Sequence, residues 1–245
     1  MTVFVGVDLG WYGKPTGLAA IHDARRVLEQ HAIARLERAA EILDWTSRQV
    51  RTDDAVIGVD APLVIPNATG IREGERQLNA EYRRYDAGCH PANLSRPFAP
   101  HVLAFSRALG ELGFRHGADM LARQPGRFQI EVHPHSASVA LFALSRIVKY
   151  KRGTREERGR GLRRLRRLMV ERLPALDPSF VPDLPHVPRS GNLKPVEDQI
   201  DAVLCAYIAA HWWYWGRQRN CVYGSNREGY IVVPKAGGYS PPSCL

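Results

Sequence analysis

Short apolar runs, each about as long as a buried strand, recur between the amino terminus and residue 132, and those that end at Asp8 and Asp60 are rich in valine and isoleucine. These runs predict strands over residues 3–9, 16–22, 26–33, 55–60 and 127–132. Only short connections separate the first three, so they should form an antiparallel meander. Between the third and fourth runs, apolar residues from Leu36 to Val50 recur at helical spacing. Such a crossover helix returns the chain parallel to the first strand.

Further helices are predicted after the fourth strand, and the one near Thr154 has an apolar stripe at helical spacing. The helices lie near residues 72–84, 98–113, 134–144, 154–176 and 195–215. The helix near Thr154 begins with a capping box, in which Thr154 and Glu157 each accept a backbone amide of the other. The last helix is apolar nearly all round beyond Asp201, so we expect it to be buried.

The remaining segments and the order of the elements predict the fold. Residues 62–97 are polar and interrupted by glycine and proline, which predicts an insertion over the mouth of the sheet, and residues 220–234 have the pattern of a terminal hairpin. A meander, a helix, a strand, a helix, a strand and late helices follow in the order of the ribonuclease H-like fold. We therefore predict one α/β domain over residues 1–245. Its mixed five-stranded sheet has the order 3-2-1-4-5 and is flanked by helices.

The overall composition is that of an ordinary globular protein. Of its 245 residues, 44% are hydrophobic and 24% charged, and no apolar run approaches the roughly 18 residues that span a bilayer. The amino terminus leads almost directly into a strand, so we expect no leader. Four cysteines lack C-x-x-C spacing, which indicates neither a zinc site nor a disulfide framework. We expect a cytoplasmic protein.

The net charge of +9 is concentrated in one segment. Residues 146–172 hold twelve lysines and arginines against three glutamates, so this basic helical segment, about 146–173, carries the whole excess and the rest is neutral. A basic stripe on a neutral body favours a polyanionic partner, such as nucleic acid. A solvated arginine-rich helix face is the alternative.

Two aspartates stand where buried strands end. Asp8 closes the first strand and Asp60 the fourth, at the edge of an α/β sheet where ligands bind. Asp201 lies near the start of the buried late helix and needs a partner there, whereas Asp198 has the alternative role of complementing the helix dipole. Three such carboxylates are the oxygen ligands that Mg²⁺ prefers. We predict that Asp8, Asp60 and Asp201 bind Mg²⁺ or Mn²⁺ and are catalytic.

Glu131 and His133 end the fifth predicted strand and share one of its faces by alternation. Glu131 is a candidate catalytic residue, as fourth ligand or general base. His133 is a candidate substrate contact because its pKa ordinarily lies near neutrality. A hydrogen-bonded structural histidine at the end of a strand is the alternative for His133.

Further candidate substrate contacts are basic. Arg72 and Arg76 in the insertion suit the geometry of phosphate groups. The alternative is a solvent-facing helix with Glu–Arg pairs. Lys149 and Lys151 flank Tyr150, and Arg152 follows, in a pattern that suits single-stranded nucleic acid.

At these residues the chain resembles a known family, the domain of unknown function 429, whose members are predicted ribonuclease H-like nucleases. The matching motifs run in order along nearly the whole chain: Gly6-Val-Asp8 with Trp11, Gly58-Val-Asp60-Ala-Pro62-Leu63, Arg72-x-x-Glu75-Arg76, Glu131-Val-His133-Pro134, Asp201-Ala202 and Glu228-Gly-Tyr-Ile-Val-Val-Pro234. The resemblance implies the fold and the acidic positions Asp8, Asp60 and Asp201, with Glu131 near them. It implies no particular substrate.

The leading functional hypothesis is a magnesium-dependent nuclease that hydrolyses phosphodiester bonds in DNA or RNA, held by the basic segment. A second hypothesis is a non-catalytic nucleic-acid-binding module with a degenerate site. A third is an ATP-dependent phosphotransferase of the actin-like type, since Asp8-Leu-Gly10 resembles a phosphate loop. That class needs two lobes, and the chain has no second Asp-x-Gly at a strand end.

Overall fold

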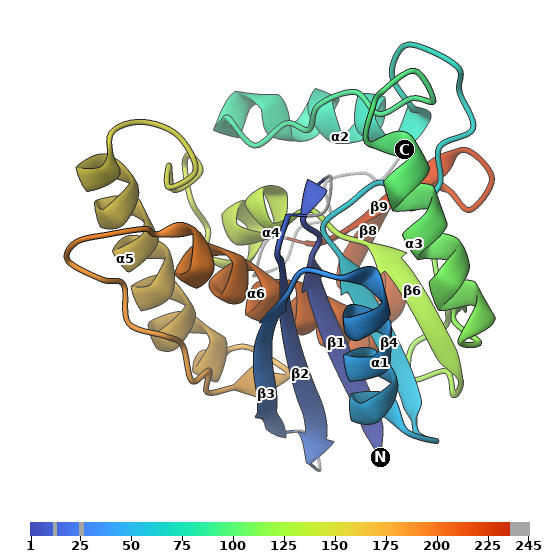
Figure 1. The fold of residues 1–245 in the computed structure, drawn as a ribbon, viewed down its shortest axis with the longest axis horizontal. Helices are drawn as coiled ribbons and strands as arrows, with labels where there is room; N and C mark the ends of the chain where they lie inside the picture. The colour runs from blue at the N-terminus through green and yellow to red at the C-terminus, as the bar shows by residue number, and fades with distance from the viewer. Residues whose placement is uncertain (12–13, 25–26, 236–245) are drawn as a thin grey trace.

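The computed structural model describes residues 1–11, 14–24 and 27–235, and its central feature is a mixed sheet (Figure 1). The strand order is β5-β6-β4-β1-β2-β3-β7, with a separate two-stranded sheet of β8 and β9. The strands are β1 (Thr2–Asp8), β2 (Thr16–Ala24), β3 (Val27–Leu36), β4 (Asp54–Val59), β5 (Arg115–His116), β6 (Arg127–Glu131), β7 (Ser179–Phe180), β8 (Asn220–Ser225) and β9 (Gly229–Pro234).

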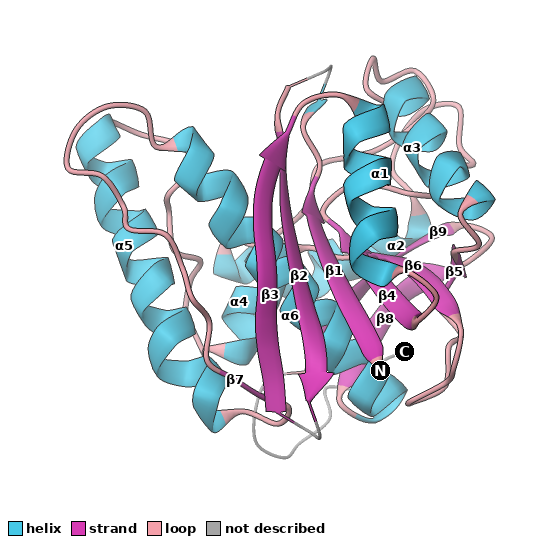
Figure 2. Cartoon of the chain, turned by 60° about the horizontal axis from the view of Figure 1, so that its bottom comes forward, coloured by secondary structure: helices cyan, strands magenta, loops and turns pink. Residues whose placement is uncertain are grey.

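Helices cover both faces of this sheet. They are α1 (Ala39–Val50), α2 (Glu73–Tyr82), α3 (Ala99–Glu111), α4 (Pro134–Leu141), α5 (Arg155–Arg172) and α6 (Lys194–Trp215). Figure 2 shows α1 and α3 on one side and α6 on the other. The core is divided in the same way, because one apolar cluster joins the sheet to α1 and α3 and a second joins it to α4, α5 and α6. No helix in the described ranges has the length and apolar character to cross a membrane.

The predicted fold class and sheet order are confirmed. β1 pairs antiparallel with β2 and β2 with β3, whereas β4 pairs parallel with β1 and β6 parallel with β4. The 3-2-1-4-5 order is therefore present, with β6 as the fifth strand, and the terminal hairpin forms. The edge strands β5 and β7 were not predicted, because two residues are too few to show a period. The first residue of the predicted third strand, residue 26, lies outside the described residues.

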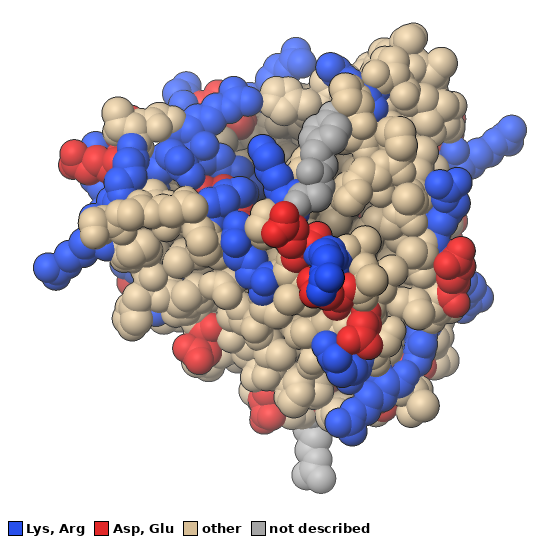
Figure 3. All heavy atoms as spheres, in the orientation of Figure 1, with Lys and Arg blue, Asp and Glu red and all other residues tan. Residues whose placement is uncertain are grey.

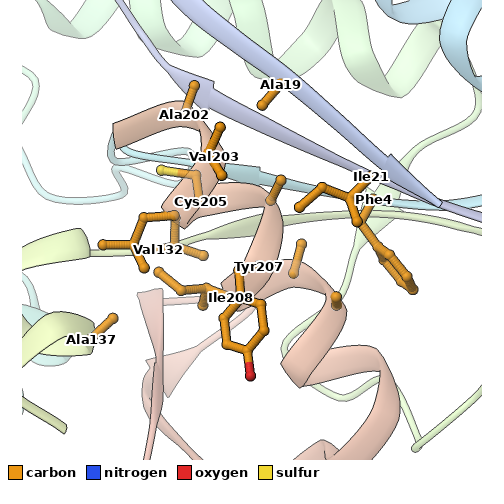
Figure 4. Packing of buried hydrophobic residues seen from close by; sticks show 14 of the residues in the cluster. Phe4, Ala19, Ile21, Val132, Ala137, Ala202, Val203, Cys205, Tyr207 and Ile208 are labelled. Atoms are coloured by element: carbon orange, nitrogen blue, oxygen red, sulfur yellow. The ribbon is translucent and has the colours of Figure 1, made fainter. Parts of the chain in front are cut away.

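Two glycines let α6 lie directly against the sheet. Gly6 in β1 and Gly58 in β4 are neighbours in the parallel register. A Cβ atom on Gly6 would lie 1.8 Å from the carbonyl oxygen of Ala202, and one on Gly58 would lie 2.6 Å from that of Cys205. Figure 4 shows this part of α6 packed beneath the strands. The missing side chains bring the first turns of α6 to the carboxyl ends of β1 and β4.

The insertion after β4 packs on the terminal hairpin. Leu78 and Tyr82 of α2 share an apolar cluster with Tyr223 of β8 and Ile231 of β9. In Figure 1, α2 lies beyond the end of the sheet at which β1 finishes. Segments far apart in the sequence thus meet next to the carboxyl edge of the sheet.

Candidate active site

Asp8 and Asp60 lie side by side at the carboxyl edge of the sheet. Val7 pairs with Val59 in the parallel register, and the amide of Asp60 donates to the carbonyl of Val7 at 2.8 Å. Asp8 follows Gly6 by two residues, and Asp60 follows Gly58 by two. Side chains two apart in a strand share a face, and α6 packs against both glycines. Both carboxylates therefore lie on the face that α6 covers.

Asp201 reaches the same place from the second turn of α6. Its side chain is fully buried, and the hydroxyl of Tyr150 donates to Oδ1 at 2.8 Å. Its charge contributes to raising the pKa of both Asp8 and Asp60, as expected for neighbouring like charges. The structure thus brings together Asp8, Asp60 and Asp201, which we call the carboxylate cluster.

Lys151 places an ammonium group within the carboxylate cluster. Its Nζ lies 2.9 Å from Oδ2 of Asp201 and 3.8 Å from Oδ2 of Asp60. Burial alone would lower the pKa of Lys151, but the nearby acidic groups, Asp201 foremost, outweigh burial and hold this pKa well above its usual value. The lysine is therefore a fixed positive charge at the site.

One ammonium does not neutralise three carboxylates. Burial is the main cause that raises the pKa of Asp60 to about 6, with Lys151 opposing it and Asp201 adding to it. Burial likewise raises the pKa of Asp8 well above its usual value, against the opposing charge of Lys151. Within the described ranges, the Asp8 carboxylate has no hydrogen bond or ion pair. The charges of Lys151 and Lys194 both oppose this pKa shift without outweighing burial, so the Asp8 carboxylate favours a further cation.

The donor chemistry of the cluster fits a divalent cation such as Mg²⁺ or Mn²⁺, which takes oxygen ligands. Of the three carboxylates, Asp60 is the most exposed, with 22% of its side chain accessible, whereas Asp8 is 8% exposed and Asp201 fully buried. Among the described residues, no group of three or more His, Cys, Asp or Glu side chains is arranged to hold a metal. Lys151 lies against the third carboxylate, that of Asp201.

A second set of charges lies at the start of α6. Asp198 is almost fully buried and forms ion pairs with Lys194 at 2.6 Å and with Arg35 at 2.9 Å. Glu197 pairs with Lys194 at 3.0 Å and with Arg158 at 3.2 Å. Asp198 is thus one partner in a network that fixes α6 to β3 and α5.

Glu131 lies on the opposite face of the sheet from the carboxylate cluster. Its partner in β4 is Val59 and not Asp60, and neighbouring side chains in a strand alternate between faces. Arg72 donates to both of its carboxylate oxygens, at 2.6 and 2.8 Å. Burial raises the pKa of Glu131 to about 7, and Arg72 opposes this shift. A catalytic role for Glu131 stays a prediction.

Arg72 was expected to contact phosphate, but the structure places it in the interior. It is 3% exposed. Its guanidinium donates to Glu131, to Glu75 at 2.9 Å and to the carbonyl of Val64 at 2.8 Å. In this arrangement it holds the insertion to β6 and does not face solvent.

The other predicted substrate contacts lie in different surroundings. Arg76 is exposed and pairs with Glu73, as in the alternative of a helix face with Glu–Arg pairs. Lys149 is exposed and lies 3.4 Å from Asp86.

Arg152 is exposed, and its Nη2 lies 3.5 Å from Nε2 of His90. His133 caps α4, with Nδ1 2.8 Å from Oγ of Ser136, and burial lowers its pKa to about 4. The structure therefore brings only Lys151, among the predicted substrate contacts, into the carboxylate cluster.

Sequence reasoning missed Tyr150 as the hydrogen-bond donor to Asp201. It also missed the close approach that fixes this loop, since a Cβ atom on Gly161 of α5 would lie 2.0 Å from the carbonyl oxygen of Lys149. The signal was present in the sequence, because a glycine within an otherwise strong helix costs stability unless something packs against it.

Comparison with known proteins gives a family but no activity. A family model described as "Protein of unknown function (DUF429)" matches residues 6–228. No curated protein matches the chain. Among solved structures, the chain is similar to the crystal structure of a complex between Fowlpox virus resolvase and its substrate, Holliday junction DNA. That match has 9% identity and a TM-score of 0.33, and covers 86% of this chain and 95% of the resolvase. A similarity at this score carries no argument about function.

Proposed function

The chain belongs to the DUF429 family of proteins of unknown function, and we propose that it is a metal-dependent nuclease that hydrolyses phosphodiester bonds in nucleic acid. One observation carries the proposal. Asp8 ends β1, Asp60 directly follows β4 and Asp201 lies in α6, and the three meet in a largely buried cluster whose negative charge exceeds that of its ammonium partner. Desolvated carboxylates in excess are costly unless a cation compensates them.

Asp8 and Asp60 would hold Mg²⁺ or Mn²⁺ at the carboxyl edge of the sheet. When bound, the ion would supply Lewis acidity toward a phosphodiester and lower the pKa of a bound water. Asp201 would orient Lys151, whose side chain is 30% exposed. The exposed part of the Lys151 ammonium would then contact a phosphate oxygen of the substrate.

The position of the basic helix supports a nucleic-acid substrate. The exposed arginines of α5 at positions 160, 163, 164 and 167 recur at helical spacing and share one face. Figure 3 shows Lys and Arg side chains gathered on the side of the molecule where α5 lies. Arg158 of α5 pairs with Glu197 of α6, one turn before Asp201. A polyanion bound along α5 would therefore pass close to the carboxylate cluster.

A cleavage assay with matched variants tests the proposal. Purified protein is incubated with labelled single-stranded, double-stranded and branched DNA and RNA, with Mg²⁺, Mn²⁺ or a chelator. We expect metal-dependent cleavage that falls by at least about 100-fold in Asp8→Asn, since even residues behind a metal ligand commonly contribute 10–100-fold. Asp44→Asn is the control, because Asp44 is exposed in α1 and pairs only with Arg48 among the described residues. Equal cleavage by Asp8→Asn and wild type would refute the mechanism.

The second candidate is a non-catalytic nucleic-acid-binding module. The ion pair of Lys151 with Asp201 favours this candidate, because the ammonium already supplies a positive charge that a metal ion would otherwise supply. This candidate predicts salt-sensitive binding that is indifferent to chelator. It also predicts no turnover by the wild type or by Asp8→Asn. The same assay therefore separates the two candidates.

A further inference from the structure

We infer that the site takes a single divalent ion, between Asp8 and Asp60, and that the ammonium of Lys151 permanently fills the second cation position against Asp201. The inference rests on the proposed function for the existence of a metal site. It goes further by stating the number of ions. It also assigns Lys151 the place of a second cation and Asp201 the role of binding that ammonium.

Each carboxylate oxygen of Asp201 already lies against a partner, a hydroxyl at Oδ1 and an ammonium at Oδ2, although Oδ2 accepts no hydrogen bond among the described residues. Oδ1 accepts from the Tyr150 hydroxyl at 2.8 Å, and Oδ2 lies 2.9 Å from Nζ of Lys151. The Asp201 side chain is fully buried, so a second ion would reach it only at the position that the Lys151 ammonium occupies. Asp8 lacks such partners among the described residues, and Asp60 is 3.8 Å from the ammonium.

The backbone that carries Lys151 is fixed from two sides. Tyr150 is 3% exposed and packs in the core cluster that includes α6, and its carbonyl accepts from Nε of Arg158 at 3.3 Å. The backbone of α5 approaches Lys149 so closely at Gly161 that a Cβ atom there would lie 2.0 Å from the Lys149 carbonyl oxygen. The backbone that carries Lys151 is therefore fixed before any ligand binds, and this fixed backbone keeps the ammonium next to Asp201.

The charges of the cluster balance with one divalent ion. Three carboxylates carry three negative charges, and Lys151 with one divalent ion carries three positive charges. At the start of α6, Arg35, Arg158 and Lys194 form ion pairs with Glu197 and Asp198, and the charge of Lys194 also acts on Asp8 and Asp60. This surrounding set adds one positive charge, which the phosphate of a substrate would balance. A second divalent ion would leave a large uncompensated positive charge in a buried site, which is costly.

Manganese binding tests the inference without any measurement of cleavage. The stoichiometry of Mn²⁺ is measured by calorimetry, and electron paramagnetic resonance shows whether two bound ions interact. We expect one Mn²⁺ in the wild type and two interacting ions in Lys151→Met, which removes the ammonium at similar size. Lys149→Met is the matched control, because that lysine is 69% exposed, and should bind one ion.

Two further variants keep the test decisive if Lys151→Met fails to fold. Lys151→Gln keeps a polar group next to Asp201 and should also admit a second ion, whereas Lys151→Arg keeps the charge and should bind one. Two ions in the wild type would overturn the inference and leave the proposed nuclease intact. A single ion in folded Lys151→Met and Lys151→Gln would likewise overturn it. If no variant binds Mn²⁺, the inference and the metal site of the proposed function fail together.

Discussion

Glu131 and Arg72 form a buried ion pair whose stability can be tested separately from catalysis. Both oxygens of Glu131 accept from Arg72, and both residues are almost fully buried. We expect Glu131→Gln to lower the free energy of unfolding by about 3 kcal/mol, because breaking a buried pair leaves a charge without its partner. Chemical denaturation measures this effect. The control is Glu73→Gln, whose exposed pair with Arg76 should contribute little. An unchanged stability in Glu131→Gln would contradict this role.

The face of the sheet on which Glu131 lies could not be predicted from its own strand. Alternation correctly placed Glu131 and Val132 on opposite faces of one strand. Which face meets α6 depends on the register between β4 and β6, and in the structure Glu131 is the partner of Val59. A shift of one residue would have put Glu131 beside Asp60. Nothing in the sequence of a single strand fixes that register.

At the scale of elements, the contact between β1 and α6 depends on the absence of a side chain at Gly6. We expect Gly6→Ala to destabilise the protein by about 3 kcal/mol or more, since the added Cβ atom would lie 1.8 Å from backbone. Gly110→Ala is the control, because Gly110 is exposed in α3 with open space around it. That control should gain roughly 0.5–1 kcal/mol from helix propensity. Thermal unfolding of both variants measures the difference, and equal effects would contradict the close packing.

Most elements were predictable because they are long enough to show the hydrophobic period of a strand or a helix. The buried strands, the capping box at Thr154 and the apolar helix α6 all follow from local sequence, and the structure contains them. The loop that carries Lys151 has no period of its own. Its conformation depends on the burial of Tyr150 and on packing against Gly161, which are tertiary interactions. Lys151 was for this reason predicted as a surface substrate contact, although its ammonium lies against Asp201.

At the scale of the whole molecule, the concentration of positive charge on α5 predicts how nucleic acid binds. Binding should weaken steeply with salt, because neutralised phosphates release counterions. We expect the triple variant Arg163→Gln, Arg164→Gln and Arg167→Gln to bind more weakly. The slope of the logarithm of its affinity against the logarithm of the salt concentration, the salt slope, should fall in magnitude by about one for each phosphate that the helix no longer neutralises. Fluorescence anisotropy at several salt concentrations measures both quantities.

A charge-matched control separates this surface from net charge alone. Arg107, Arg115 and Arg227 are exposed on other elements, and Arg107 and Arg115 belong to α3 and β5. Changing these three to glutamine removes the same charge and should leave the salt slope nearly unchanged. An equal reduction of affinity in the two triple variants would show that α5 is not the binding surface.

We propose above all that Asp8 and Asp60, within the carboxylate cluster, hold a divalent cation. An anomalous difference map from a crystal soaked in Mn²⁺ tests it most directly, because the metal scatters anomalously where light atoms do not. We predict one peak within ligand distance of Asp8 and Asp60, with Lys151 still paired to Asp201. A map without a peak at these carboxylates, in crystals whose soak is shown to work by Mn²⁺ bound elsewhere, would contradict the claim.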